Sequence, residues 1–317
     1  MNPEHRGMIS AGEVLSFDSN FESGNLDRVV MLSPNEYDLY MRPDTNSQGH
    51  HQWFYFKAVS KRPLGQVKFN ILNFTKSRSL YEQGMKVCIC NIAEKESILE
   101  SQRGRGLKPL QTEMVGWTRG GDNIRYGPSK LNSMIPKNLP RLRFYQLSFT
   151  HNFEAEDEDE TYFAYSFPYT FTRLSSLLHE LKQRKEIKSF YKDATPLCSS
   201  LSGVEVPYLI VTSRAHQETF DMIDPEEHEP DSVPVSKKKK TIFLTGRVHP
   251  GETNSSFMME GFIKLITSKS NQVAIELRKR IVFKIVPFTN PDGVIVGNYR
   301  VSMSGNDLNR RYQKPHP

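Results

Sequence analysis

Two patterns of hydrophobic and polar positions divide the chain. Up to about residue 172, short runs rich in aromatic and β-branched residues are separated by Gly, Pro and Asn. This pattern is typical of strands joined by turns, and many such strands indicate an antiparallel β-sandwich. The predicted strands lie at residues 50–59, 65–74, 86–92, 142–153 and 161–171. The stretch from about residue 100 to 130 shows no such pattern and is predicted to be a long irregular connection.

The period changes at Thr172, where leucines begin to recur at helical spacing, at Leu174, Leu177, Leu178 and Leu181. Further along, apolar strands alternate with helices; the strands are 206–213, 241–248 and 280–288, and the helices are 252–268 and 271–279. This alternation indicates an α/β domain with a largely buried sheet. We therefore predict a β-sandwich domain over residues 1–172 and an α/β domain over residues 173–317.

Two polar segments interrupt these patterns. The acidic run 154–160 is interpreted as a solvated hairpin loop, because it lacks the spacing and turn glycine of a calcium-binding loop. Residues 221–240 are acidic, Pro-containing and then basic, which predicts a surface insertion. The lysines at its end, Lys237–Lys240, fit a nuclear signal, but a solvated charge run is favoured.

Composition narrows the class of protein. The chain has 317 residues, 37% of them hydrophobic, and a mean hydropathy of −0.56. We expect no transmembrane helix and no signal peptide, because no apolar run is long enough and the start is polar. Three cysteines cannot build a disulfide framework, and an odd count favours a reducing compartment such as the cytoplasm. We also expect a soluble monomer. The net charge of +6 suits an acidic partner, and basic residues do not interleave with aromatics as in nucleic-acid-binding proteins.

One stretch carries candidate metal chemistry. In TIFLTGRVHPGETNSSFMMEGF, residues 241–262, His249 and Glu252 follow the end of an apolar strand, where open α/β sheets place their ligands. An imidazole and a carboxylate suit Zn²⁺, although a catalytic zinc needs a third protein ligand. The spacing alone is weak, since His151 and Glu154 repeat it. A packed histidine beside a helix N-terminal carboxylate remains the alternative.

The following strand carries three more motifs. VPFTNPDGVIVGNYRVSMSGNDLNRRY, residues 286–312, contains NPDG, GNYR and DLNRR after HPGE. In this order the set resembles the M14 metallocarboxypeptidases, and most closely the cytosolic carboxypeptidase subfamily, which shortens glutamate chains on tubulin and other proteins. FAYSFPYTFTRL, at the end of the predicted sandwich, is similar to the N-terminal domain of that subfamily. The resemblance implies that the α/β region is the first half of a carboxypeptidase-type domain.

The resemblance also implies roles for individual residues. His249 and Glu252 would bind one Zn²⁺, and Arg300 would polarise the scissile carbonyl and hold its oxyanion. Asn309 and Arg310 would hold the terminal carboxylate of the substrate, a task that suits the planar fork of a guanidinium. Without the family, the arginines would be interpreted as solvated surface residues, and NPDG as a turn.

The sequence departs from the family in one respect. The M14 pattern needs a third ligand, a histidine, and a glutamate general base further along the chain. His316 is the only histidine after His249, and it stands between two prolines, so we do not expect it to bind the metal. We therefore expect weak or absent zinc binding, an inactive fragment, and an α/β sheet with an unpaired edge strand and exposed apolar faces.

Three functions remain open at this point. The first is a zinc metallocarboxypeptidase that removes C-terminal or side-chain-linked glutamates from acidic protein tails such as those of tubulin. The second is a non-catalytic module whose sandwich binds tubulin or another protein. The third, an amidohydrolase on the same scaffold, is disfavoured by DLNR together with the sandwich. Neither nucleic acid nor membrane is an expected partner.

Overall fold

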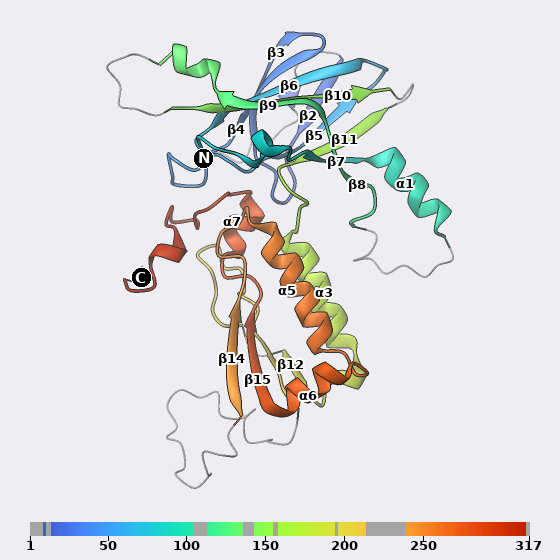
Figure 1. The fold of residues 1–317 in the computed structure, drawn as a ribbon, viewed down its shortest axis with the longest axis vertical. Coiled ribbons are helices and arrows are strands. Elements are labelled where there is room, and N and C mark those ends of the chain that lie inside the picture. Colours follow the sequence, from blue (N-terminus) through green and yellow to red (C-terminus); the bar gives the residue numbers. More distant parts are fainter. Residues whose placement is uncertain are drawn as a thin grey trace. The chain divides into compact units, whose positions relative to one another are not determined.

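The structure is a computed structural model, and it describes part of the chain. The described residues are 9–10, 14–103, 113–135, 143–154, 158–193, 196–213 and 239–314. They belong to two compact units (Figure 1). Unit 1 comprises Met1–Phe171, His249–Thr253 and Asp292–Pro317, and unit 2 comprises Thr172–Val248 and Asn254–Pro291. The division into domains at residue 172 stays a prediction.

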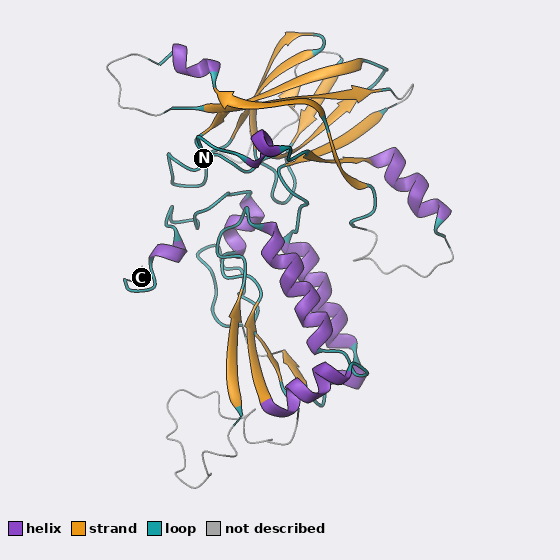
Figure 2. Ribbon diagram, in the orientation of Figure 1, coloured by secondary structure: helices purple, strands orange, loops and turns teal. Residues whose placement is uncertain are grey.

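Unit 1 contains two β-sheets (Figure 2). The six-stranded sheet has the order β1 (Ile9–Ser10), β2 (Leu15–Asp18), β5 (Tyr55–Ser60), β11 (Asp159–Ala164), β7 (Val87–Asn91) and β8 (Trp117–Gly120). The five-stranded sheet has the order β3 (Leu26–Ser33), β4 (Glu36–Met41), β6 (Gly65–Phe74), β10 (Tyr145–Phe153) and β9 (Asp122–Pro128).

Aromatic side chains pack the two sheets face to face. Phe69 of β6 is fully buried. Its ring centroid lies 6.1 Å from that of Phe17, 6.2 Å from that of Phe56 and 5.3 Å from that of Phe163, all three in the other sheet. Alternate residues of each strand point inward, as β5 shows with its regular alternation of half-buried and buried positions. The predicted β-sandwich is confirmed.

Three features of the sandwich differ from the sequence-based expectation. The pair β4 and β6 is parallel, because the chain crosses to β5 in the other sheet between them. The stretch predicted to be irregular from about residue 100 to 130 contains β8 and β9. Helix α1 (Ile92–Ser101) directly follows β7 and was also not predicted. These elements are largely exposed, so they lack the hydrophobic period from which strands and buried helices are recognised.

Unit 2 contains a four-stranded sheet with the order β12 (Tyr191–Asp193), β13 (Leu209–Val211), β15 (Ile281–Val286) and β14 (Lys240–Thr245). β14 and β15 are parallel, and the other pairs are antiparallel. The helices are α3 (Phe171–Gln183), α5 (Thr253–Ile266) and α6 (Gln272–Arg280), which confirms the predicted α/β pattern.

Helices α3 and α5 lie side by side in unit 2 (Figure 1). A buried bidentate ion pair joins Arg173 of α3 to Glu260 of α5, with both N–O distances at 3.1 Å. On α5, the ring of Phe262 packs against that of Phe283 in β15, with centroids 5.5 Å apart. Of the four leucines at helical spacing, Leu174, Leu177 and Leu181 are buried and Leu178 is half-buried.

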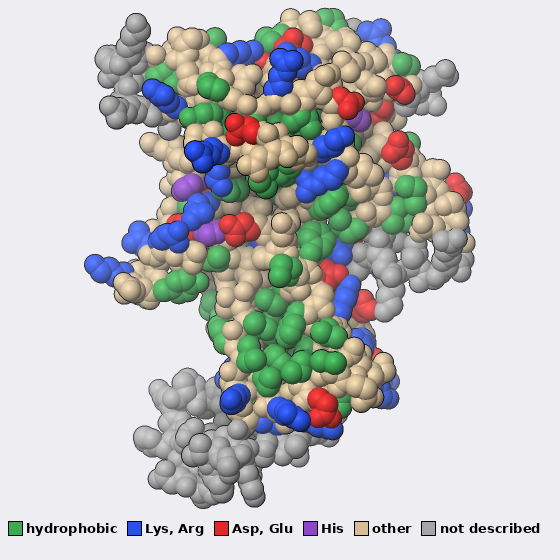
Figure 3. Space-filling view, in the orientation of Figure 1, with side chains coloured by type: hydrophobic (Ala, Val, Ile, Leu, Met, Phe, Trp, Pro, Cys, Tyr) green, Lys and Arg blue, Asp and Glu red, His purple; other side chains and the backbone are tan. Residues whose placement is uncertain are grey.

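The sheet of unit 2 has an open edge at β14 within the described part of the chain. Ile242 and Phe243 of β14 are 39% and 55% exposed, and Met258 of α5 is 76% exposed. Figure 3 shows hydrophobic side chains gathered on the surface of this unit. The prediction of an unpaired edge strand with exposed apolar residues is therefore confirmed.

Several predictions lie outside the described residues. They concern the central residues 155–157 of the acidic loop, most of the insertion 221–240, and His316. No helix in the described ranges combines the length and the apolar character that a membrane span needs.

Candidate functional site

The HPGE motif forms the turn between β14 and α5. The amide of Glu252 donates to the carbonyl of His249 at 3.1 Å, and that of Gly251 donates to the carbonyl of Tyr299 at 2.8 Å. A Cβ on Gly251 would lie 2.6 Å from Cδ2 of Tyr299, so only glycine allows this approach. The turn is thereby fixed against the GNYR segment, within unit 1.

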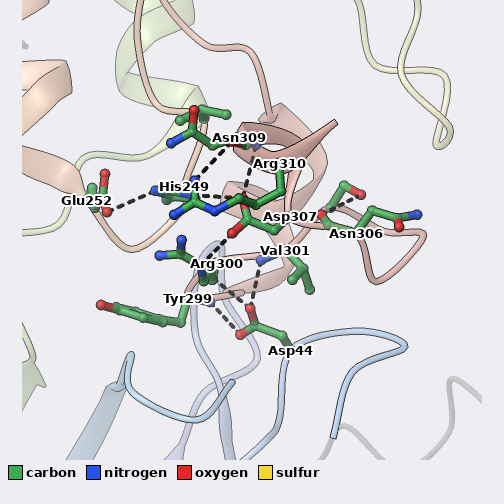
Figure 4. Close-up of polar contacts among 12 residues, drawn as sticks. Asp44, His249, Glu252, Tyr299, Arg300, Val301, Asn306, Asp307, Asn309 and Arg310 are labelled. Atoms are coloured by element: carbon green, nitrogen blue, oxygen red, sulfur yellow. Dashed lines mark hydrogen bonds and ion pairs between the residues drawn. The ribbon is translucent and has the colours of Figure 1, made fainter. Parts of the chain in front are cut away.

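This turn brings the two predicted metal ligands together. Nδ1 of His249 lies 2.9 Å from Oε1 of Glu252 (Figure 4). The His249 ring is buried, whereas the side chain of Glu252 is 53% exposed. The pair therefore has a fixed imidazole on the protein side and a carboxylate that solvent can reach.

Asp307 contacts the other nitrogen of the same ring. Its Oδ1 lies 3.1 Å from Nε2 of His249. A neutral imidazole has one N–H donor and one acceptor, yet both nitrogens here face carboxylates. If Nε2–H donates to Asp307, Nδ1 keeps its lone pair toward Glu252, and a shared proton or a bound cation must lie between them. This is the arrangement of a metal-ligating histidine whose far nitrogen is held by a carboxylate.

The second oxygen of Asp307 holds Arg300. Nε of Arg300 donates to Oδ2 of Asp307 at 2.7 Å. Burial raises the pKa of the Asp307 carboxyl, but the hydrogen bonds from His249 and Arg300 outweigh burial, so its pKa lies below the usual value. One ionised carboxylate thus links the imidazole to the guanidinium.

Asn309 and Arg310 follow Asp307 on a short 3₁₀ turn, Leu308–Arg310. The Asp307 side chain caps this turn by accepting the amide of Asn309 at 3.0 Å. Arg310 is exposed, and its Nη1 donates to the carbonyl of Asn309 at 3.0 Å. Both predicted substrate-binding residues therefore lie beside the His249–Asp307–Arg300 cluster (Figure 4).

The NPDG motif was interpreted as a turn, and this is wrong. Residues Pro291–Val296 form helix α7, with Asp292 in its first turn. Proline is favoured at the first helical position, because the amide it lacks would have no partner within the helix. The helix ends at Val296, and Gly297, with a φ of +78°, turns the chain into the rest of the GNYR motif, Asn298–Arg300.

His249 and Glu252 fit part of a zinc site. Imidazole nitrogen and carboxylate oxygen are both common zinc ligands, and their separation of 2.9 Å is compatible with one shared ion. Within the described ranges, however, no group of three or more His, Cys, Asp or Glu side chains is arranged to hold a metal. The structure therefore brings together two donors and leaves the third unassigned.

Two functional candidates were missed by the sequence analysis. Asp307 lies within the quoted DLNRR, and the need of a ligating histidine for a carboxylate partner is a signal that could have found it. Asp44 lies in the loop between β4 and β5, and its carboxylate accepts the backbone amides of Tyr299, Arg300 and Val301. No sequence spacing connects Asp44 with residues some 255 positions later.

Comparison with known families agrees with both halves of the chain. The model of the cytosolic carboxypeptidase N-terminal domain matches residues 17–96, and that of the M14 zinc carboxypeptidases matches residues 180–316. The chain belongs to the cytosolic M14 carboxypeptidases. The family description implies zinc, in agreement with the donor types of His249 and Glu252.

Similar proteins include cytosolic carboxypeptidase 1 of Homo sapiens, 37% identical over 308 residues. The match covers 96% of this chain and 23% of the human protein. Cytosolic carboxypeptidase 2 of Xenopus tropicalis is 38% identical over 307 residues, covering 96% of this chain and 28% of that protein. The chain therefore spans about a quarter of the length of these relatives.

Solved structures support the fold. A metallo-carboxypeptidase from Burkholderia cenocepacia superposes with a TM-score of 0.63 at 23% identity, covering 96% of this chain and 63% of that chain. A metallo-carboxypeptidase from Pseudomonas aeruginosa gives a TM-score of 0.62 at 22% identity, covering 95% and 62%. Both confirm a β-sandwich followed by a carboxypeptidase-like α/β region.

Proposed function

We propose that the protein to which this sequence belongs is a zinc-dependent carboxypeptidase that removes C-terminal or side-chain-linked glutamates from acidic protein tails, such as those of tubulin. The observation that carries the proposal is the convergence of His249, Glu252 and Arg300 around Asp307. A metal-ligand pair and a cation for a developing negative charge are the parts that carboxypeptidase chemistry needs. Family membership supports the reaction class, whereas the glutamate preference rests on resemblance to the subfamily.

In this proposal His249 and Glu252 hold the zinc ion, which when bound supplies Lewis-acid polarisation. Asp307 contacts His249 and is not itself a proposed ligand of the metal. By accepting from Nε2 of His249, it directs the lone pair of Nδ1 toward the metal position. It also keeps the buried ring from turning.

Arg300 and Arg310 bind two different negatively charged groups of the substrate. Arg300 donates only Nε to Asp307 in the contacts described above, which leaves its terminal nitrogens to approach the carbonyl oxygen that becomes anionic. Arg310 is exposed on the next turn, where a guanidinium can bind a free carboxylate through two parallel hydrogen bonds. Asn309 adds an amide beside it. Selection of chain ends follows from this two-point contact.

For the 317-residue polypeptide itself, we infer weak zinc binding and no activity. Only two donors converge in the described part of the chain, while a catalytic zinc site uses three protein ligands. In the same proposal the protein is a cytoplasmic monomer. The name of its relatives, cytosolic carboxypeptidase, supports the location, and the net charge of +6 suits the acidic tails of the proposed substrates.

A second candidate function is a non-catalytic protein-binding module. The aromatic core shared by the two sheets of the sandwich favours it, because unit 1 has a packed interior of its own. In that case the sandwich binds tubulin or another acidic partner, and the HPGE and DLNR segments are vestigial.

Three measurements separate these functions. The first is zinc content by mass spectrometry, and the second is glutamate release from a peptide with a polyglutamate end. Both are measured on the 317-residue chain and on the protein from its natural source. Release by the natural protein that is lost in Glu252→Gln and Arg300→Ala, but kept in Arg103→Ala, supports the peptidase. Co-sedimentation with microtubules without any glutamate release supports the binding module. One tightly held zinc per 317-residue chain would overturn the inference that this polypeptide is inactive for lack of a ligand.

A further inference from the structure

A loop of the β-sandwich holds the backbone of Arg300. Oδ1 of Asp44 accepts the amide of Tyr299 at 2.5 Å, and Oδ2 accepts the amides of Arg300 and Val301 at 2.6 and 2.9 Å (Figure 4). Three consecutive amides thus converge on one carboxylate that is only 3% exposed. All four residues belong to unit 1.

We call these three hydrogen bonds to Asp44 the clamp. The same loop makes further contacts on both sides of it. Asn298 accepts the amide and the hydroxyl of Thr45 at 3.0 and 3.1 Å. Asn46 donates to the carbonyl of Met303 at 2.7 Å. Because residues before and after the Tyr299–Val301 stretch are held, the clamp fixes the direction of the whole segment and not only one peptide.

Gly305 shows how closely the two segments approach. Its φ is +77°, and a Cβ at this position would lie 2.3 Å from the carbonyl oxygen of Asn46. Only glycine satisfies both conditions without displacing the loop. The segment that carries Arg300 is therefore shaped to fit the loop that carries Asp44.

Burial of a carboxylate costs desolvation free energy. Burial raises the pKa of the Asp44 carboxyl above its usual value, although the three amides and His50 oppose this effect. An apolar side chain would pack there without the desolvation cost but could not accept three amides. The choice of aspartate is explained by the position that it imposes on the backbone.

The position of Arg300 is consequently defined from two ends. Asp44 fixes its backbone amide, and Asp307 fixes Nε of its side chain at 2.7 Å. Asp307 also contacts His249, so the guanidinium is held at a defined place relative to the His249–Glu252 pair. Charge stabilisation depends on such pre-set geometry, since a misplacement of about 1 Å can cost about a hundredfold in rate.

We propose that Asp44 is a positioning residue for Arg300, by which the β-sandwich forms part of the catalytic apparatus and does more than flank it. This proposal rests on the proposed function of Arg300 in the reaction. The clamp itself, however, can be tested without activity, so failure of one does not imply failure of the other.

The first test observes Arg300 directly in the 317-residue chain by NMR. The Nε–H cross-peak of Arg300 is assigned by its loss in Arg300→Lys. Asp44→Asn is isosteric but replaces one of the two acceptor oxygens with an NH₂ group, so the three amides cannot all keep their acceptor. We expect the cross-peak to shift or broaden beyond detection. Thr45→Val, a milder change, should shift it in part.

Asp38→Asn is the matched control. Asp38 is also a buried carboxylate of the sandwich, 5% exposed, but it pairs with Lys130 and Asn70 instead of the Arg300 segment. A merely structural role for Asp44 would lower the melting temperature and leave the Arg300 cross-peak unchanged. An unchanged cross-peak in Asp44→Asn would overturn the proposal.

The second test is a double-mutant cycle on glutamate release by the protein from its natural source. We expect Asp44→Asn to lower kcat by about tenfold to a hundredfold with little change in KM. In an Arg300→Ala background the same change should cause no further loss, whereas independent structural damage would multiply the losses. A lost cross-peak with unaltered kcat would also overturn the proposal. If the unmodified protein releases no glutamate, the proposed function fails, and the NMR result still decides whether Asp44 positions Arg300.

Discussion

Oδ1 of Asp307 lies 3.1 Å from Nε2 of His249, the ring nitrogen that does not face Glu252. The contact fixes the orientation of a buried imidazole whose other nitrogen is a candidate metal ligand. A hydrogen-bond acceptor on the far side of the ring favours the tautomer with its lone pair on Nδ1. In the proposed zinc site, Asp307 would therefore support metal binding through the His249 ring, without being a ligand itself.

Removal of this carboxylate tests that role. We expect Asp307→Ala to weaken zinc binding by about tenfold to a hundredfold, because the ring is free to turn and to change its tautomer. Affinity is measured on the protein from its natural source and on its variants, by competition with a chromogenic zinc chelator. Asp122→Ala, an exposed carboxylate of β9, is the control and should bind zinc as the unmodified chain does. Equal affinities for Asp307→Ala and the control would contradict the assignment.

The buried ion pair of unit 2 leads to a second prediction. The side chains of Arg173 and Glu260 are 6% and 7% exposed, and Lys264 contacts the same carboxylate at 2.5 Å. Arg173→Ala would remove the bidentate partner and should lower the free energy of unfolding by about 3–5 kcal/mol. The control is Arg103→Ala, whose pair with Glu100 has side chains 81% and 68% exposed. There the expected loss is below about 1 kcal/mol. Urea denaturation followed by circular dichroism measures both, and comparable losses would refute the prediction.

Buried elements were predictable from the sequence. The aromatic and β-branched runs of β5 and β6 and the helical spacing of Leu174, Leu177 and Leu181 reflect burial in a core, and the structure confirms these elements. Exposed elements carry no comparable hydrophobic pattern in their sequence. The strands β8 and β9 are largely exposed and carry few apolar residues, so pairing with their hydrogen-bonded neighbours, β7 and β10, defines them more than their own sequence does.

The candidate site was predictable to the extent that its residues lie in short motifs. His249, Glu252, Arg300, Asn309 and Arg310 were expected together, and the structure places them around Asp307. The supporting residues were not predictable in the same way. Asp44 acts through backbone amides, whose position depends on tertiary structure and leaves no trace in residue type or spacing.

His151 makes the stability of the sandwich depend on pH. Its ring packs edge-on against Phe153 and Phe163, with centroids 4.9 and 5.1 Å away. Burial lowers its pKa, although Asp159, Asp122 and Glu154 oppose the effect. Because the folded-state pKa lies below the unfolded value of about 6.5, the unfolded chain takes up the proton first as pH falls. The contribution of His151 to stability is therefore fully present above the unfolded-state pKa. It is lost as the pH falls from that value toward the folded-state pKa.

The measurement is urea unfolding at pH values of about 7.5 and about 5.5. We expect His151→Phe, which keeps an aromatic ring but cannot be protonated, to lose less stability between the two pH values than the unmodified chain. His179→Gln changes an exposed histidine of α3 and should behave as the unmodified chain does. If His151→Phe shows the full pH dependence, the histidine responsible lies elsewhere.

The three cysteines should differ sharply in reactivity. Cys88 and Cys90 of β7 are 0% and 2% exposed, whereas Cys198 is exposed. Burial raises the pKa of the Cys88 thiol to about 12, against the opposing charge of Arg119, and burial also raises that of Cys90. Thiolates are the reactive species, so a thiol that is both inaccessible and protonated reacts slowly.

Titration of the native chain with a chromogenic disulfide at mildly alkaline pH should therefore release one equivalent rapidly, and the urea-unfolded chain should release three. Cys198→Ser should abolish the rapid phase of the native chain without changing the slow one. Cys88→Ser should leave the rapid phase intact. A rapid second equivalent in the native chain would mean that β7 exchanges with an open form, because Cys88 and Cys90 are covered as long as β7 stays paired with β11 and β8.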